Sequence, residues 1–393
     1  MMKRKGILQL LEQYKADSRE QKVNLVVGIY MDKTGNSPIF NVVKKVEENL
    51  ISSEITKAKF NMLGSCEYQD SVKKLLFTNL EEKELDNILT VQTLGASGAL
   101  SITANIIANK YPEASLWLSN PTWENHPAIF ENHISSIKEY QFKPKDGVLD
   151  IDTIISDLSA AKAGDVVLFQ GCCHNPTGIV ITTDQWNKLA SLCSERHLLP
   201  IIDFAYQGLE VDLVLDTEVL NIFNGYGIDY IVCNSFSKNM GLYDERIGAL
   251  SLVFNDSKLT QEWELAIRNI VRTTYSLPPV HGSLVVTEVL SNPEFNSAWR
   301  QELDELRDYI DYRRNLVFNK MKELGITDKY LNYTQQKGMF ICLQLSLEHV
   351  DLLREEYGIY IIDSGRVSIA SLDETKVNYL CESLAATAYM IES

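Results

Sequence analysis

The stretch Ser235-Phe236-Ser237-Lys238-Asn239-Met240-Gly241-Leu242-Tyr243-Asp244-Glu245-Arg246 directly follows an apolar run over residues 228–233. Such a run predicts a buried strand, and the carboxyl end of a strand in an α/β sheet opens into the usual ligand crevice. Lys238 at that place offers an amine that can form a Schiff base with an aldehyde. The two serines and Arg246 are suited to bind a phosphate dianion. The alternative interpretation is a solvated loop after a strand.

Three further apolar runs each lead to groups that suit one part of the same ligand. Residues 88–94 precede a glycine turn containing Ser97 and a helical pattern to about residue 111, which is a natural anion cradle. Residues 166–169 precede a turn that carries Asn175, whose amide can donate to a phenolate oxygen. Residues 198–202 end in Asp203 and, three positions later, Tyr206. A carboxylate there suits a pyridinium nitrogen, and the tyrosine can reach the same ring. Together the four strand ends indicate pyridoxal 5'-phosphate (PLP).

With these motifs in this order, the chain resembles a class I aminotransferase of the PLP fold type I superfamily, in the aspartate and aromatic amino acid branch. The resemblance extends from Val23 to Val367, which is nearly the whole chain. It implies an α/β fold in which a mainly parallel, seven-stranded sheet covered by helices forms a large domain. A smaller α/β domain is built from both chain ends.

The resemblance also implies roles for individual residues at the cofactor. Lys238 matches the lysine that holds PLP as a Schiff base and later moves the proton between Cα and C4′. Asp203 matches the carboxylate that keeps the pyridine nitrogen protonated. Tyr206 and Asn175 match the pair that hydrogen-bonds the ring's phenolate oxygen, and Trp123 matches the aromatic plate over the ring. The residues that match the phosphate ligands are Ser97, Ser235, Ser237 and Arg246.

Three more residues match groups that contact the substrate. Arg366 matches the arginine that grips the α-carboxylate. An arginine suits this role because its planar guanidinium fits a carboxylate better than an ammonium does. Arg272 matches the arginine that a neighbouring subunit supplies for a distal carboxylate. Gly28 matches a glycine in the small-domain segment that closes over the substrate. Trp123 and Asn175 also belong to the expected substrate contacts.

Four positions depart from the family's pattern. Phe60 stands where the family usually has a tyrosine that crosses the dimer interface to the phosphate. Gln170 stands where many members have a histidine behind the aspartate, while His126 is retained at another supporting position. Leu277 replaces a polar residue near the substrate pocket, and Met31 stands where aspartate-specific members carry a lysine. The last two changes make the pocket more apolar and favour aromatic substrates.

Composition is that of an ordinary globular chain: 393 residues, 45% of them hydrophobic and 23% charged. The formal net charge of −16 argues against nucleic acid or an anionic membrane as the main partner. The basic start, Met2 to Lys5, precedes an amphipathic stretch without an apolar signal core, so we expect a cytoplasmic protein. Seven cysteines lack paired metal spacing and are expected to be buried, reduced thiols. The six histidines form no HxxxH or HxH pair, and no metal site is predicted.

Alternating strand and helix patterns over about residues 38–298 predict the parallel sheet. An amphipathic pattern over about residues 302–324 predicts a long helix that joins the domains, and residues 338–343 predict a strand beyond it. We therefore expect a large PLP-binding domain at residues 38–305 and a small domain made of residues 1–37 and 306–393.

The expected protein is a homodimeric aminotransferase in which Arg272 and Phe60 reach the neighbouring site. It would move the amino group between an aromatic or acidic L-amino acid and 2-oxoglutarate by a ping-pong mechanism. Two alternatives stay open on the sequence alone. One is a PLP-dependent β-lyase or β-decarboxylase on the same scaffold. The other is a non-catalytic PLP-binding regulatory module, which the short segment before the first motif and the acidic composition disfavour.

Overall fold

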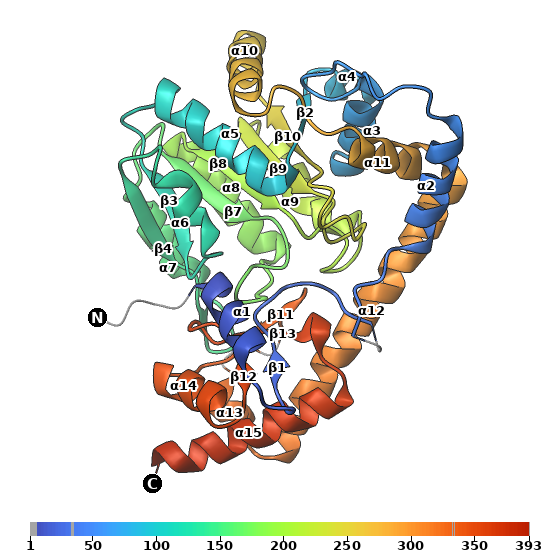
Figure 1. Ribbon diagram of the computed structural model, residues 1–393. Coiled ribbons are helices and arrows are strands. Elements are labelled where there is room, and N and C mark those ends of the chain that lie inside the picture. The colour runs from blue at the N-terminus through green and yellow to red at the C-terminus, as the bar shows by residue number, and fades with distance from the viewer. Residues whose placement is uncertain (1–5, 33–34, 332, 334, 393) are drawn as a thin grey trace.

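The computed structural model describes residues 6–32, 35–331, 333 and 335–392. A seven-stranded sheet in the order β2-β10-β9-β8-β7-β3-β4 forms the upper part of the molecule in Figure 1. The neighbouring strands are parallel except for the two pairs that include β10. In spatial order the strands are β2 (Leu89–Thr93), β10 (Gly248–Val253), β9 (Tyr230–Ser235), β8 (Leu199–Phe204), β7 (Val166–Gln170), β3 (Leu116–Asn120) and β4 (Ile137–Gln141).

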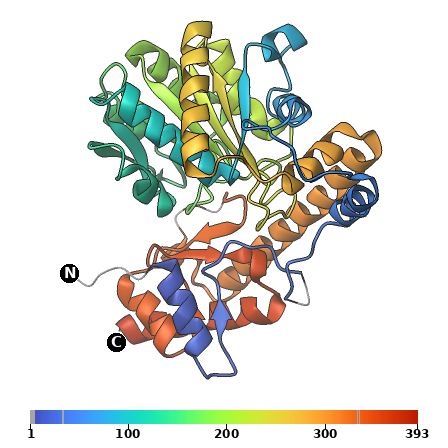
Figure 2. The ribbon, with the colours of Figure 1, turned by 45° about the horizontal axis from the view of Figure 1, so that its top comes forward.

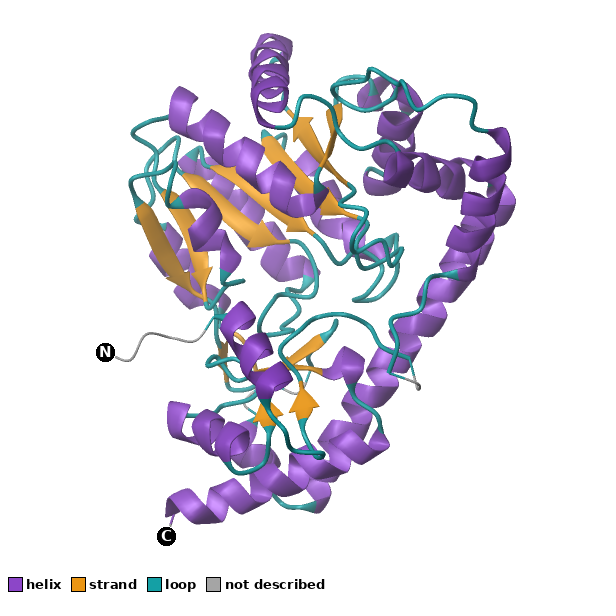
Figure 3. Ribbon diagram, viewed as in Figure 1, coloured by secondary structure: helices purple, strands orange, loops and turns teal. Residues whose placement is uncertain are grey.

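Helices cover both faces of this sheet, as Figure 3 shows, so its central strands are continuous apolar runs rather than alternating ones. In β7, Val166 and Leu168 pack with one helix layer, and Val167 and Phe169 pack with the other. The first layer contains α5 (Gly95–Lys110), α6 (Asn125–Phe130) and α10 (Ser257–Thr274). The second contains α3 (Cys66–Leu76), α7 (Ile151–Leu158), α8 (Thr183–Arg196), α9 (Glu218–Gly225) and α11 (His281–Ser291). We call this sheet with its helices the sheet lobe.

A second lobe, here called the terminal lobe, lies below the sheet lobe in Figures 1 and 2 and contains segments from both ends of the described chain. Its strands form two small sheets, a parallel pair of β1 with β12 and an antiparallel pair of β11 with β13. Its elements are α1 (Ile7–Ala16), β1 (Val23–Asn24), α13 (Thr327–Tyr330), β11 (Phe340–Cys342), α14 (Leu347–Glu355), β12 (Ile359–Tyr360), β13 (Arg366–Ser368) and α15 (Glu374–Glu392). The pairing of β1 with β12 fixes the amino-terminal segment against the carboxyl-terminal one.

One long helix, α12 (Pro293–Glu323), runs along the side of the molecule from one lobe to the other (Figure 2). Trp299 and Leu303 in its first half, and Val317 and Met321 in its second, are buried in the same large core. The helix ends where expected but begins earlier than about residue 302. Asn292 caps it by accepting hydrogen bonds from the amides of Glu294 and Phe295. Pro293 stands at the first helical position, which suits it because that amide has no intrahelical partner.

The other expected elements lie close to their positions in the structure, and the expected α/β architecture with a mainly parallel, seven-stranded sheet is confirmed. The expected strands at 88–94, 166–169, 198–202 and 228–233 correspond to β2, β7, β8 and β9. Among the cysteines, Cys66 is exposed and Cys342 is partly exposed, so the expectation of burial is wrong for these two. None of the described helices is both long and apolar enough to span a bilayer. The remaining elements are α2 (Asn41–Ser53), α4 (Glu82–Leu85), β5 (Pro144–Lys145), β6 (Val148–Leu149) and the 3-10 helices η1 (Leu215–Thr217) and η2 (Ile369–Ser371).

Candidate active site

A cavity of about 180 Å³ lies where the carboxyl ends of the parallel strands meet the terminal lobe. Every residue predicted for the site lines it except Arg272. They come together because parallel strands present their carboxyl ends at the same edge of the sheet. The predicted residues in the lining are Gly28, Ser97, Trp123, Asn175, Asp203, Tyr206, Ser235, Ser237, Lys238, Arg246 and Arg366.

Lys238 follows β9 and carries its amine 5.2 Å from the centre of the Tyr206 ring. Burial lowers the pKa of Lys238 because it penalises the charged ammonium, and the positive charge of Arg246 lowers it further. The carboxylate of Asp203 acts in the opposite direction. The net effect favours the neutral amine, which is the nucleophilic and basic form.

Asp203, at the end of β8, is buried with one oxygen occupied and the other unpartnered. Its Oδ2 lies 3.0 Å from Nε2 of His126, and Nδ1 of that ring lies 2.7 Å from Oγ1 of Thr122. Its Oδ1 has no hydrogen-bond partner among the described residues. An ionised carboxylate in such a place is costly unless a cation or donor meets it. The free oxygen is therefore suited to a cationic N–H in the cavity.

Three residues of the cavity lining, Asn175, Tyr206 and Arg366, form a hydrogen-bonded group. The Asn175 amide donates to the Tyr206 hydroxyl at 3.4 Å, and its Oδ1 accepts from Nη1 of Arg366 at 3.1 Å. Arg366 also donates to the carbonyl of Val26 at 2.5 Å and lies 4.3 Å over the ring of Phe340. Burial raises the pKa of Tyr206 and lowers that of Arg366. No carboxylate is hydrogen-bonded to this buried guanidinium in the described chain, so it can receive one from a ligand.

The hydroxyls of Ser235 and Ser237 and the guanidinium of Arg246 line the cavity together with the start of α5. Ser235 donates to Ser237 at 3.1 Å, and Arg246 donates to Ser237 at 3.3 Å. Gly95 begins α5 with φ +67°, and a Cβ there would lie 2.8 Å from Nη2 of Arg246. Only glycine therefore allows the guanidinium to lie against the helix start. The positive end of the helix, the hydroxyls and the guanidinium make an anion cradle of phosphate character.

Gln170 also lines the cavity and supports its wall. Its amide nitrogen donates to the carbonyl of Asn175 at 2.9 Å, and its Oε1 accepts the Asn175 amide N–H at 2.8 Å. This pair of bonds holds the turn that presents the Asn175 side chain. Gln170 is not hydrogen-bonded to Asp203, whose neighbour is His126.

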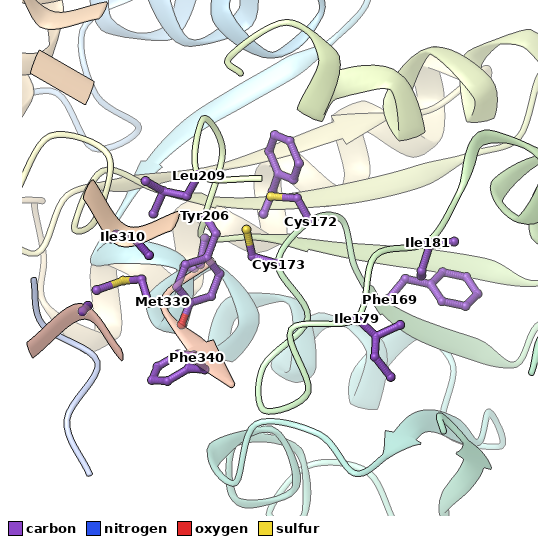
Figure 4. Close-up of a cluster of buried hydrophobic side chains, with 14 of the residues drawn as sticks. Phe169, Cys172, Cys173, Ile179, Ile181, Tyr206, Leu209, Ile310, Met339 and Phe340 are labelled. Carbon is purple, nitrogen blue, oxygen red and sulfur yellow. The ribbon is translucent and has the colours of Figure 1, made fainter. Parts of the chain in front are cut away.

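Part of the wall consists of apolar residues that were not predicted. They are Ile7, Val26, Val27 and Phe340. Figure 4 shows Phe340 beside Tyr206, at a centroid distance of 6.4 Å, within a cluster that joins the two lobes. A Cβ on Gly28 would lie 2.4 Å from the Phe340 ring, so this segment passes the ring only as glycine. The apolar run 25–27 was a possible signal for the two valines, whereas Ile7 had none.

Arg272 and Phe60 lie away from this cavity. Arg272 is exposed in the last turn of α10 and donates to Oγ of Ser276 at 2.6 Å. Phe60 is 82% exposed, in a segment that also displays Ile51 and Ile55. Leu277 follows the same end of α10, and Met31 is held by backbone hydrogen bonds in the terminal lobe.

Comparisons with known proteins agree over nearly the full length. Residues 20–384 match the family described as aminotransferase class I and II. The chain is 40% identical to an aspartate aminotransferase of Haemophilus influenzae over 380 residues, 96% of each chain. It is 33% identical to an aromatic-amino-acid aminotransferase of Pseudomonas aeruginosa over 96% of this chain and 95% of that one. A crystal structure of the Burkholderia pseudomallei aromatic-amino-acid aminotransferase, covalently bound to PLP, superposes with a TM-score of 0.92 at 33% identity. That match covers 98% of this chain and 97% of the other.

Proposed function

The chain belongs to the class I and II aminotransferases, and we propose that it moves an amino group between an aromatic or acidic L-amino acid and 2-oxoglutarate with ping-pong kinetics. It is a PLP-dependent transaminase whose substrates are amino acids and 2-oxo acids. The observation that carries the proposal is the set of strand-end groups around one cavity, with a buried arginine, Arg366, open to a carboxylate.

The described residues fit the cofactor. The unpartnered Oδ1 of Asp203 suits the pyridinium N–H, and the cradle of Ser235, Ser237 and Arg246 at the start of α5 suits the phosphate. When bound, PLP supplies an aldehyde for amines and an electron-withdrawing ring for the substrate's Cα. Trp123 lines the same cavity and suits the flat face of the ring.

Each residue of the site then has a distinct role in the reaction. Lys238, whose pKa burial lowers, takes the proton from the substrate Cα and returns it later in the exchange. Asp203, supported by His126, stabilises positive charge at the ring nitrogen. Tyr206 and Asn175 donate hydrogen bonds toward the phenolate oxygen. Arg366 orients the α-carboxylate, and Gly28 and its neighbours cover the substrate.

The apolar wall of Ile7, Val27 and Phe340 supports acceptance of aromatic side chains. Burial of a ring against such a wall contributes roughly 1.5–3 kcal/mol. Arg272 of the neighbouring subunit would bind the side-chain carboxylate of acidic substrates. Ile51, Ile55 and Phe60 are large apolar side chains exposed to solvent, and a homodimer interface would cover them.

We further propose the domain division at residues 38–305 against 1–37 and 306–393, and a cytoplasmic location. The division places its boundary within α12, the helix that both lobes share.

Borohydride reduction followed by peptide mapping tests the cofactor assignment. We expect the reduced adduct on Lys238, because its amine lines the cavity and burial lowers its pKa. A panel of donors with 2-oxoglutarate, followed by absorbance, tests the reaction, and we expect turnover of phenylalanine or tyrosine as well as aspartate. A label on another lysine would refute the assignment of Lys238, and no amino transfer from any donor would refute the reaction.

A further inference from the structure

The segment from Val26 to Met31 lines the cavity with its first three residues and is held at both ends. At one end, the carbonyl of Val26 accepts from Arg366, the proposed carboxylate-binding arginine. At the other, Met31 donates its amide to the carbonyl of Ala370 at 3.0 Å, and its carbonyl accepts from Arg313 at 2.6 Å. The partners are Arg366 and Ala370 of the terminal lobe and Arg313 in the second half of α12.

One further bond joins this segment to the sheet lobe. The amide N–H of Tyr30 donates to the hydroxyl of Tyr243 at 3.2 Å. Tyr243 lies in the loop after Lys238 and, through its hydroxyl, spans from the sheet lobe to the segment that carries Gly28. Burial raises the pKa of Tyr243 to about 12, so its hydroxyl stays protonated at neutral pH.

The same loop is held at its other end by the arginine of the anion cradle. The guanidinium of Arg246 donates to the backbone carbonyl of Tyr243 at 3.1 Å, as well as to Ser237 and the carbonyl of Leu94. Arg246 has φ +50°, a conformation that is costly for a residue with a side chain. An anion in the cradle competes for these same N–H donors. Its binding therefore acts directly on the loop that positions the Tyr243 hydroxyl.

We propose that Tyr243 is a positioning residue that couples the cofactor's phosphate to the position of the Val26–Met31 segment beside the substrate site. The coupling passes from Arg246 through the Tyr243 backbone to its hydroxyl and then to the Tyr30 amide. The inference rests on the proposed function, since it requires PLP in the cradle and a carboxylate at Arg366. Tyr243 is not among the residues that line the cavity, so its effect on a ligand is indirect.

The test is a double cycle that removes the cofactor phosphate and the Tyr243 hydroxyl, separately and together. Enzyme loaded with PLP and enzyme loaded with pyridoxal, which lacks the phosphate, are titrated with maleate, a non-reacting dicarboxylate. The absorbance of the bound cofactor reports the Kd of maleate. The coupling is the ratio of the Kd with pyridoxal to the Kd with PLP. We expect this ratio to exceed one in the wild type and to fall by about two- to tenfold in Tyr243→Phe, the worth of one neutral hydrogen bond.

Tyr226→Phe is the matched control, because Tyr226 follows α9 away from the cavity and is 40% exposed. Its ratio should equal that of the wild type. A purely structural role of Tyr243 would weaken maleate binding equally with both cofactors and leave the ratio unchanged, which would overturn the proposal. A ratio of one in the wild type would also overturn it. Failure of the wild type to take up PLP would refute the proposed function itself, and is seen before any variant is compared.

Discussion

At the scale of single residues, the most informative atom is Oδ1 of Asp203. One oxygen of this carboxylate is satisfied by His126, and the other is buried without a partner in the described chain. Folded proteins rarely leave a buried charged oxygen in that state, because its desolvation is not compensated. The geometry is explained if a cofactor N–H completes the site.

Replacing Asp203 by asparagine preserves the shape of the side chain and removes its charge. We expect the first half-reaction to slow by at least ~10³-fold, about 4 kcal/mol of barrier, because the ring nitrogen loses the charge that keeps it protonated. Single-turnover absorbance with an excess of amino acid measures the rate. Reduction of the adduct on Lys238 serves as the control for bound PLP, and a near-normal rate with PLP in place would contradict the role.

At the scale of elements, the turn after β8 carries a partly buried acidic group, Glu210, outside the cavity. Glu210 accepts the amide N–H of Cys173 at 2.6 Å. Burial, together with the nearby charge of Asp216, raises the pKa of Glu210 to about 8. Burial likewise raises the pKa of Asp216 to about 6. The positive charge of Lys337, from the terminal lobe, partly offsets the effect on Glu210.

These pKa values predict a pH-dependent stability. Because the folded pKa of Glu210 exceeds its unfolded value of 4.5, folding favours its protonated form, and this stabilisation is lost as pH rises toward about 8. Asp216 completes its own titration mostly below pH 7, so the window from pH 6 to 8 reports mainly Glu210. Glu210→Gln should be more stable relative to wild type at pH 8 than at pH 6, by about 1–2 kcal/mol after solvent screening. Urea unfolding of the PLP-loaded proteins measures this, and parallel pH profiles would contradict it.

At the scale of the whole molecule, the cavity of a single chain lacks one predicted substrate contact, Arg272. Arg272 is exposed at the end of α10 and does not line the cavity of its own subunit. The apolar side chains of Ile51, Ile55 and Phe60 are likewise exposed. Both observations are explained if a second copy covers this surface and receives Arg272.

Hybrid dimers test whether Arg272 acts across the interface. Chains carrying Lys238→Ala and chains carrying Arg272→Leu are co-expressed with different affinity tags, and the hybrid is isolated. If Arg272 acts in the neighbouring subunit, the hybrid has one intact site and about half the wild-type dicarboxylate activity. The Arg272→Leu homodimer should lose at least about 30-fold in kcat/KM for aspartate, since a close charge pair contributes roughly 2–5 kcal/mol.

Aromatic donors are the internal control for this experiment, because their turnover does not need the distal ion pair. They should be affected much less by Arg272→Leu. A hybrid no better with aspartate than the Arg272→Leu homodimer would show that the arginine acts within its own subunit.

The parallel sheet, the order of the motifs and the strand-end groups of the cavity could all be predicted from the amino-acid sequence. This was possible because apolar runs report strands locally, and because the carboxyl ends of parallel strands share one edge. Asn292 and Pro293 are also a sequence signal for the start of α12. The predicted helix rested on the amphipathic pattern alone and therefore began about nine residues too late.

The residues that complete the cavity from the other lobe depend on how the two lobes pack. Ile7 and Phe340 line the cavity together with Tyr206 and Arg366, although these segments are far apart in the chain, and no periodicity encodes such an arrangement. The same holds for the hydrogen bonds of Gln170 to Asn175 and of Tyr30 to Tyr243. A residue type and its spacing identify what a side chain can do, whereas its partner depends on how the two lobes are placed.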